Sequence, residues 1–310
     1  MQNLFNMNLR TVNSFQNIVD TLGTERGLKF IGKNNDEATN TLYVFTNSTH
    51  ANKTHLLKQL KRESWEVKFY TKHLLFIRQN YTFLSLELPE VLEIFQVGDE
   101  VYLLLSYYDG DKFNFNTPDL DLAKKMPGIV KDLLLINPEE ILEGSSNFDF
   151  KAYEERFWIF FEKAIKLGLI HRSKEETIRD IANNLLIQGR NTQKMIISNG
   201  DFNPRNIIRL SGGKLVLIDW DGIVSPLEYH LAYPWLLNYR NPSWQKEYAQ
   251  SFEELLPIKA SNVRYHLMTI SLQRAVDEKG HNTSDADRMS EDHTKNFYRS
   301  LDGFNSLTEF

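Results

Sequence analysis

The sequence predicts an α+β protein with two lobes, a small lobe rich in β-strands followed by a larger helical lobe. The chain has 310 residues, enough for one large or two medium-sized domains. Segments with strand-like alternation dominate before residue 107, and segments with helical periodicity dominate from residue 150 onward. We place the join at residues 106–111, so that residues 1–108 form the N-terminal lobe and residues 109–310 the C-terminal lobe.

The composition excludes several classes of protein. Lys and Arg number 36 against 41 Asp and Glu, a net charge of −5, which argues against a nucleic-acid-coating protein because phosphates require a basic surplus. The absence of cysteine excludes disulfide scaffolds, Cys-ligated metals and thiol nucleophiles. No apolar run approaches the roughly 20 residues of a membrane span, and the N-terminus has no apolar leader segment. We therefore expect a cytoplasmic protein with neither nucleic acid nor a membrane as partner.

The N-terminal lobe is predicted to consist of short strands around one helix. Residues 63–77 change to helical spacing, with Glu63 and Glu66 in the first turns, where the helix dipole favours acids. Gly98-Asp99 indicates a hairpin between the last two strands. The strands are expected at residues 27–31, 41–45, 54–60, 91–95 and 101–107.

The C-terminal lobe is predicted to be helical around one small group of strands. Residues 150–167 and 174–187 have the apolar stripe of amphipathic helices. From Leu227 onward the pattern is again helical. Short strands are expected between these regions, at residues 195–198, 206–210 and 214–218. Prolines predict helix breaks at Pro226, Pro234, Pro242 and Pro257.

The short strands carry the residues that point to chemistry. Asp201 follows the first strand, Asn206 enters the second, and Asp219 ends the third, so the three side chains converge at the strand ends. Such oxygen ligands suit Mg²⁺, which completes its shell with water and phosphate. Phosphoryl transfer needs an Asp to accept a hydroxyl proton and an Asn and an Asp to hold metal. The alternative is that these residues only form turns and end strands.

Residues 199–221 resemble the catalytic and metal-binding loops of the aminoglycoside phosphotransferase and choline kinase-like superfamily. The family pattern is H-G-D-x-x-x-x-N, a hydrophobic strand, and I-D-W/F-D/E; here Asn199 stands in place of the histidine. The resemblance implies a bilobal protein-kinase-like fold and transfer of the γ-phosphoryl group of ATP or GTP to a hydroxyl of a small-molecule acceptor. It makes Asp201 the catalytic aspartate, Asn206 and Asp219 the Mg²⁺ ligands, and Asp221 a supporting acid.

Two features of the N-terminal lobe extend the resemblance, and a third, the composition of one loop, departs from the glycine-rich signature. Lys58, in an apolar strand, and Glu66, at a helix start, match the phosphate-binding lysine and its acid partner. Lys61 or Lys53 and Glu63 are the alternatives, and solvated surface charges are a further reading. The phosphate-covering loop, residues 34–40, has no glycine. The apolar strand that leads to Asp109-Gly110 resembles the family's hinge, where the backbone of Ser106 and Tyr108 faces the nucleobase.

Two further groups of residues have two interpretations each. An aromatic cluster is expected to be core beneath the catalytic loop, with a cage for a cationic ligand as the alternative. Acidic residues at 277–292 are expected to form a solvated face, with attraction of an amine substrate as the alternative. The aromatic cluster comprises Tyr229, Tyr233, Trp235, Tyr239 and Trp244.

A nucleotide-binding scaffold without transferase activity is the rival function, favoured by Asn199 and the glycine-free loop.

Overall fold

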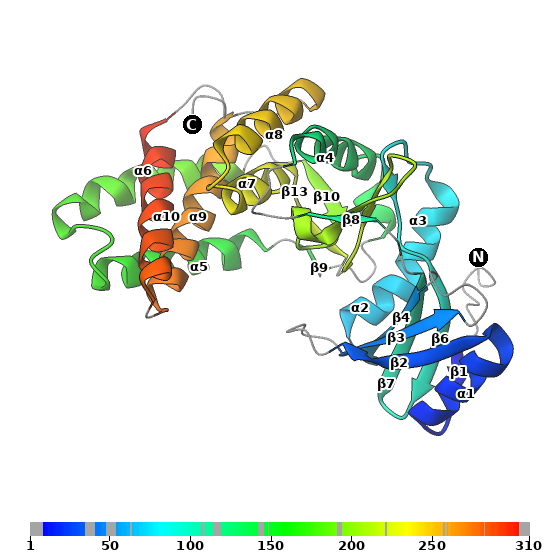
Figure 1. Ribbon diagram of the computed structural model, residues 1–310. Coiled ribbons are helices and arrows are strands. Elements are labelled where there is room, and N and C mark those ends of the chain that lie inside the picture. The colour runs from blue at the N-terminus through cyan, green and yellow to red at the C-terminus, as the bar shows by residue number, and fades with distance from the viewer. Residues whose placement is uncertain are drawn as a thin grey trace.

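The structure, a computed structural model, combines a six-stranded sheet, two small sheets and a group of helices (Figure 1). It is a mixed α+β fold, as predicted. The described residues are 9–34, 41–47, 54–62, 64–106, 108, 110–113, 119–141, 146–147, 149–190, 194–220, 222–256, 258, 260–281 and 283–303.

The six-stranded sheet forms the N-terminal part of the molecule. Its strand order is β1-β6-β7-β4-β3-β2, with β1 parallel to β6 and the other neighbours antiparallel. Side chains alternate between the two faces, so Leu57 and Lys58 point in opposite directions. The strands are β1 (Leu9–Thr11), β2 (Leu28–Asn34), β3 (Thr41–Asn47), β4 (Thr54–Lys61), β6 (Val91–Val97) and β7 (Glu100–Ser106).

One helix covers each face of this sheet. Helix α1 (Phe15–Arg26) buries Ile18 and Leu22 against Leu57 and its neighbours in the sheet. On the opposite face lies a longer helix that begins as α2 (Trp65–Lys68), continues through a π-helical segment (Phe69–His73) and ends as α3 (Leu74–Asn80). π-Helical segments inside helices are frequent at functional sites. Lys58 therefore faces the helix that carries Glu66.

Two small sheets lie between the six-stranded sheet and the helices (Figure 1). One has the order β10-β13-β9 and the other β5-β12-β11-β8. Strand β5 precedes β6 in the chain and pairs with β12, so backbone hydrogen bonds connect the two parts of the molecule. The strands are β5 (Leu86–Glu87), β8 (Asp111–Lys112), β9 (Ser146–Asn147), β10 (Met195–Ser198), β11 (Ile207–Arg209), β12 (Leu215–Leu217) and β13 (Ile223–Pro226).

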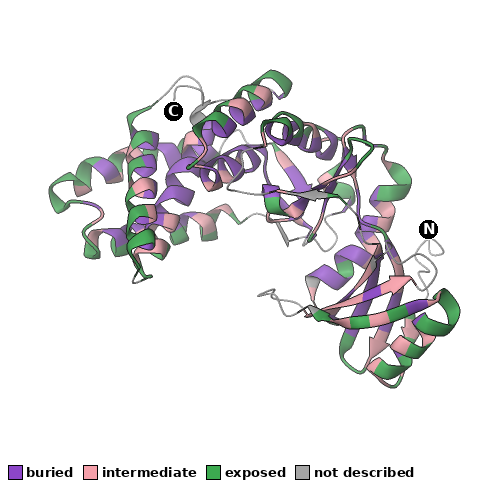
Figure 2. Cartoon of the chain, in the orientation of Figure 1, coloured by how far each residue is buried: buried purple, intermediate pink, exposed green. Residues whose placement is uncertain are grey.

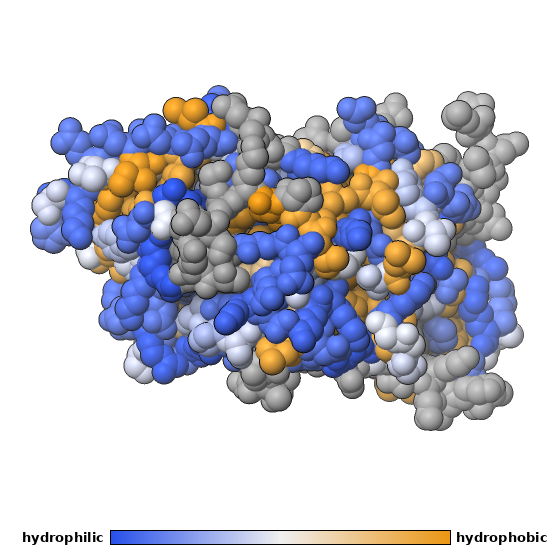
Figure 3. Space-filling model, turned by 90° about the horizontal axis from the view of Figure 1, so that it is seen from above, coloured by the Kyte–Doolittle hydropathy of each residue, from blue (hydrophilic) through white to orange (hydrophobic). Residues whose placement is uncertain are grey.

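Seven further α-helices complete the part of the fold that the structure describes. They bury their apolar faces inward and leave their outer faces exposed, as Figure 2 shows for α8 and α10. Hydrophilic residues cover most of the face in Figure 3, with hydrophobic residues gathered in smaller areas between them. No helix among the described residues is long and apolar enough to cross a membrane. The helices are α4 (Leu120–Leu133), α5 (Phe150–Lys166), α6 (Glu175–Arg190), α7 (Leu227–Leu237), α8 (Pro242–Leu255), α9 (Ala260–Lys279) and α10 (Ser284–Asp302).

The break predicted at Pro234 is wrong, because this proline lies inside α7. Pro226 and Pro242 do stand at helix starts, where the missing N–H costs nothing. Pro234 is the eighth residue of α7, and the His230 carbonyl that it cannot bond accepts instead from the Tyr248 hydroxyl at 2.6 Å, so the helix continues through it. Asn206 is also misplaced by the prediction: it ends a 3₁₀ turn (Pro204–Asn206), and the strand begins at Ile207. Pro257 lies outside the described residues.

Candidate active site

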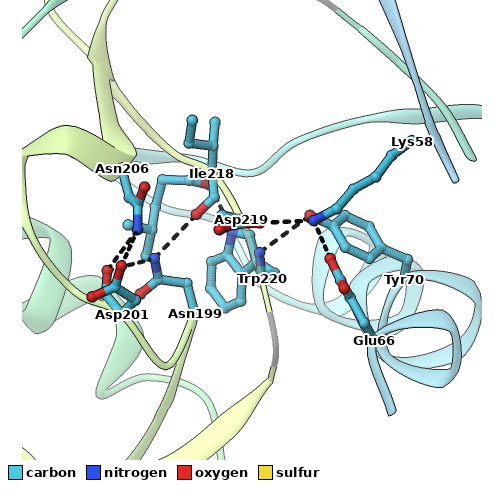
Figure 4. A network of polar contacts seen from close by, with 10 residues as sticks. Lys58, Glu66, Tyr70, Asn199, Asp201, Asn206, Ile218, Asp219 and Trp220 are labelled. Atoms are coloured by element: carbon cyan, nitrogen blue, oxygen red, sulfur yellow. Dashed lines mark hydrogen bonds and ion pairs between the residues drawn. The ribbon is translucent and has the colours of Figure 1, made fainter. Parts of the chain in front are cut away.

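The loop after β10 fixes Asp201 through its own backbone carbonyl. That carbonyl accepts hydrogen bonds from the side-chain amides of Asn199 (3.1 Å), Asn203 (3.2 Å) and Asn206 (2.9 Å). The Asn206 amide nitrogen also donates to Asp201 Oδ2, at 2.9 Å. None of these contacts uses Asp201 Oδ1 or Asn206 Oδ1, and Figure 4 shows the two side chains side by side, with the Asn206 nitrogen toward Asp201.

Asn199, which stands where the family pattern has histidine, is a bridge between two loops. Its side chain is fully buried, and its amide nitrogen donates to the carbonyl oxygens of Asp201 and Ile218, both at 3.1 Å. A histidine N–H could supply one of these hydrogen bonds, whereas the NH₂ group supplies both. The amide therefore ties the Asp201 loop to the strand end that leads into Asp219.

Asp219 occupies a backbone conformation that non-glycine residues rarely adopt. Its φ is +59°, the one positive value at a non-glycine position among the described residues. Such strain persists where surrounding contacts hold it, and it clusters at functional sites. The Asp219 side chain is 53% exposed, and its Oδ1 accepts from Lys58 Nζ at 2.7 Å.

Lys58 is a buried cation between two carboxylates. It contacts Glu66, from α2, as well as Asp219, and its side chain is only 6% exposed (Figure 4). Burial alone would lower the pKa of Lys58, but Tyr70, Asp219 and Glu66 outweigh it, so that the pKa is raised and the amine stays charged. The pairing of Lys58 with Glu66 is the one predicted, while Lys61 is exposed. Lys53, Glu63 and Asp221 lie outside the described residues.

The segment after Asp219 packs on the helix that carries Glu66. The Trp220 ring stacks on Phe69, with centroids 5.4 Å apart. The backbone N–H of Trp220 donates to the Tyr70 hydroxyl at 3.2 Å. Gly222 has a φ of +64°, and a Cβ there would lie 2.0 Å from the Phe69 ring. Only glycine fits this approach. The contact between this segment and the helix therefore fixes the position of Asp219 relative to Glu66.

The predicted hinge residues lie at the end of β7. The Ser106 N–H donates to the Glu90 carbonyl at 3.0 Å, so a nucleobase contact at Ser106 would use its carbonyl oxygen. The Tyr108 hydroxyl donates to the Leu88 carbonyl at 3.1 Å, which turns this side chain back toward the N-terminal part. Burial raises the pKa of Tyr108. The nucleobase role of both residues stays a prediction, as does that of the 34–40 loop, most of which lies outside the described residues.

The oxygen atoms of this site suit a divalent metal that is bound by the protein on one side and by nucleotide phosphates on the other. Asp219 offers an exposed carboxylate and Asn206 an amide oxygen, the hard oxygen ligands of Mg²⁺. The described residues contain no group of three or more His, Cys, Asp or Glu side chains that could hold a metal unaided. Such sparse protein ligation is typical of Mg²⁺ sites completed by substrate phosphates.

A pocket of about 470 Å³ opens beside Asp201, within the size range of small-molecule sites. Asp201 and Asn206 form one wall, and residues of the C-terminal helices form the others. Trp235 and Trp244 of the aromatic cluster are buried, as predicted, and Tyr229 and Tyr233 pack against the same core. Tyr233 and Tyr239 also line the pocket. The lining residues are Asp201, Asn203, Arg205, Asn206, Tyr233, Leu237, Tyr239, Arg240, Asn241, Arg274, Glu278, Met289 and His293.

Sequence reasoning missed Arg274 as a pocket residue. Its guanidinium donates to the Tyr233 hydroxyl at 3.2 Å, and Tyr233 lies close enough to Asp201 for the carboxylate to act on its pKa. Burial first and Asp201 next raise the pKa of Tyr233 to about 12, so the phenol keeps its proton. Arg274 lies in the middle of a helix with no local motif, so only the tertiary packing of α7 against α9 reveals it.

Comparison with solved structures confirms the protein-kinase-like fold. Aminoglycoside 2′-phosphotransferase-IIIa in its GDP complex superposes with a TM-score of 0.59 at 10% identity, covering 93% of this chain and 98% of that one. Choline kinase from Streptococcus pneumoniae gives 0.58 at 14% identity, covering 93% and 99%. Macrolide 2′-phosphotransferase from Brachybacterium faecium gives 0.56 at 10% identity, covering 90% and 98%. No protein-family model matches the sequence, and no curated protein sequence matches it.

Proposed function

We propose that the protein is a small-molecule kinase that transfers the γ-phosphoryl group of a nucleoside triphosphate to a hydroxyl of a small acceptor. The observation that carries the proposal is the network in Figure 4, in which Glu66, Lys58 and Asp219 form one ion-paired chain beside Asp201 and Asn206. These residues come from segments up to 161 positions apart. Turn formation alone gives no reason for them to converge on one another, or for Asp201 and Asn206 to line an open pocket.

In the proposed reaction, Asp201 accepts the proton of the acceptor hydroxyl. The hydroxyl oxygen bonds to the γ-phosphorus while the bond from that phosphorus to the β,γ-bridging oxygen breaks, which gives a phosphate monoester and a nucleoside diphosphate. Asn206 orients the Asp201 carboxylate by donating to Oδ2. Lys58, held by Glu66, pairs with the nucleotide phosphates, which would take over the contact that Asp219 now makes.

We assign Asn206 and Asp219 as the ligands of Mg²⁺, which would neutralise charge on the phosphate oxygens when bound. Solved neighbours support a nucleotide and a divalent cation: a spectinomycin phosphotransferase was crystallised with ADP, and an amicoumacin kinase with AMP-PNP and Ca²⁺. We propose ATP or GTP as donor, with the Ser106 carbonyl and the Tyr108 backbone at the nucleobase.

The rival function is a nucleotide-binding scaffold without transferase activity. Asn199 and the glycine-free loop favour it, but the buried Asn199 amide holds both the Asp201 loop and the strand end that leads into Asp219. This favours a working active site over a degenerate one.

Acceptor-dependent release of ADP or GDP in the presence of Mg²⁺ tests the proposal, measured on a panel of hydroxylated amines, sugars and acids. Product mass should rise by one phosphoryl group for at least one acceptor. Mg-nucleotide binding without transfer to any of them would favour the scaffold.

A further inference from the structure

The charges of the Asp201 pocket indicate what kind of acceptor it takes. Three arginines line it, Arg205, Arg240 and Arg274, against the carboxylates of Asp201 and Glu278. His293 adds no charge near neutral pH, because burial first and Arg274 next lower its pKa to about 4. Since Asp201 is assigned to the acceptor hydroxyl, the remaining lining carries two more positive than negative groups.

Among the described residues, Arg274 has no carboxylate within ion-pair distance, and its guanidinium donates to the Tyr233 hydroxyl. Glu278 follows it by one turn of α9, yet no ion pair joins them among the described residues, although this spacing normally brings such side chains together. Both groups instead line the pocket. A half-buried guanidinium of this kind is suited to a carboxylate or a phosphate, which it can bind through two parallel N–H donors.

The tyrosines of the pocket do not form a cage for a cation. Arg274 lies over the Tyr233 ring, 5.9 Å from its centroid, and Tyr229 stacks on that ring at 5.5 Å. Arg240 lies over the Tyr239 ring at 5.4 Å. The protein's own guanidinium groups therefore occupy the positions that a cationic ligand would need.

The acidic residues at 277–292 do not supply an amine site either. Asp285 contacts Arg288 at 3.1 Å and Arg240 at 3.9 Å, and Asp287 contacts Lys279 at 2.6 Å. Of the acids in this range, only Glu278 is a lining residue. Asp285 and Asp287 are therefore already paired with the protein's own cations and are not available to an amine substrate.

On the basis of the proposed function, we propose that the acceptor carries an acidic group, a carboxylate or a phosphate, that Arg274 binds while the acceptor hydroxyl lies at Asp201. The Tyr233 hydroxyl lies between the two, so the acidic group and the reacting hydroxyl belong to one compact molecule.

Four probes on one carbon skeleton test this inference: glycerate, glycerol 3-phosphate, glycerol and 2-amino-1,3-propanediol. Their dissociation constants are measured by calorimetry on nucleotide-free protein. Glycerate or glycerol 3-phosphate should bind at least about tenfold more tightly than the neutral and the amino probe. The tighter of the two acids identifies the acidic group.

Arg274→Gln should remove the preference for the acid, with a loss of tenfold or more in its affinity. Arg172→Gln is the matched control, since it removes an exposed arginine outside the pocket and should change nothing. Arg274→Lys keeps the charge without the planar fork and should retain part of the affinity. If Arg274→Gln does not fold, phenylglyoxal labelling of wild-type Arg274 replaces it: glycerate or glycerol 3-phosphate should protect the residue and glycerol should not.

Equal binding of all four probes, tightest binding of the amino probe, or no binding of any probe would overturn the inference. Because the titration needs neither nucleotide nor turnover, its result is separate from that of the transfer assay. Acid binding without phosphoryl transfer would count against the kinase proposal alone, and transfer to a neutral or amino acceptor with no acid preference would count against the acidic acceptor alone.

Discussion

At the scale of single residues, Asp201 is the side chain on which the proposed chemistry depends. Asp201→Asn keeps the shape of the side chain and an oxygen that can accept from Asn206, but it removes the base. We expect kcat to fall by about 10²–10⁴-fold. The measurement is acceptor-dependent release of nucleoside diphosphate.

The thermal stabilisation by Mg-nucleotide serves as the control for this variant and should be unchanged. Turnover at the wild-type rate in Asp201→Asn would remove Asp201 from the mechanism.

The buried Asn199 amide is expected to contribute to the stability of the fold. Asn199→Ala leaves the carbonyl oxygens of Asp201 and Ile218 without this donor in a buried site. The expected loss in free energy of unfolding is about 1–3 kcal/mol, measured by urea denaturation. Asn80→Ala is the control, because the Asn80 amide also donates to a carbonyl but is exposed. Equal, small effects of the two substitutions would show that the bridge contributes little.

At the scale of elements, the contact between the segment after Asp219 and the helix with Glu66 is the junction most sensitive to a small change. Gly222→Ala combines a positive φ with a Cβ that would collide with the Phe69 ring. Gly98→Ala has nearly the same φ, +59°, with no atom within 4 Å of the added Cβ, so it carries only the backbone strain of about 1–2 kcal/mol. We expect Gly222→Ala to lose clearly more stability in thermal melts, and to lose the stabilisation by Mg-nucleotide. Equal melting temperatures of the two variants would show that the Phe69 ring can move aside for the added Cβ at little cost in stability.

Elements with a strong local pattern were predictable, and elements defined by distant partners were not. The alternating strands β3 and β4 and the helix α5 lie within a few residues of their predicted positions. The two-residue strands β5 and β8 exist only because β12 and β11 pair with them, and the predictions also missed α1 and α4. The candidate site divides in the same way.

Asp201, Asn206 and Asp219 stand in one short motif and were identified from it, although their roles stay predictions. Arg274 lies on a separate helix and no sequence pattern marks it, whereas Tyr233 was noted in the aromatic cluster but expected in the core.

At the scale of the whole molecule, buried histidines make stability depend on pH. Burial lowers the pKa of His230 and His293 to about 4 and that of His266 to about 3. The unfolded chain, with its histidines near 6.5, therefore binds more protons than the folded chain between about pH 6.5 and pH 4. Folded stability is fully present above pH 6.5 and is lost as the pH falls through this window, by roughly 1–2 kcal/mol per histidine at pH 5.

The last prediction concerns the size of that pH slope. His230→Asn preserves a donor for the Pro226 carbonyl, which His230 Nδ1 contacts at 3.1 Å, and removes one buried imidazole. Urea melts at pH 7.5, 6 and 5 should then show about one proton fewer taken up on unfolding than in the wild type. His281→Asn, at an exposed position, should leave the slope unchanged. A wild-type stability that is flat from pH 7.5 to 5 would contradict the neutral, buried state of these histidines. An equal reduction of the slope in both variants would show that the pH dependence does not come from burial of His230 in the folded chain.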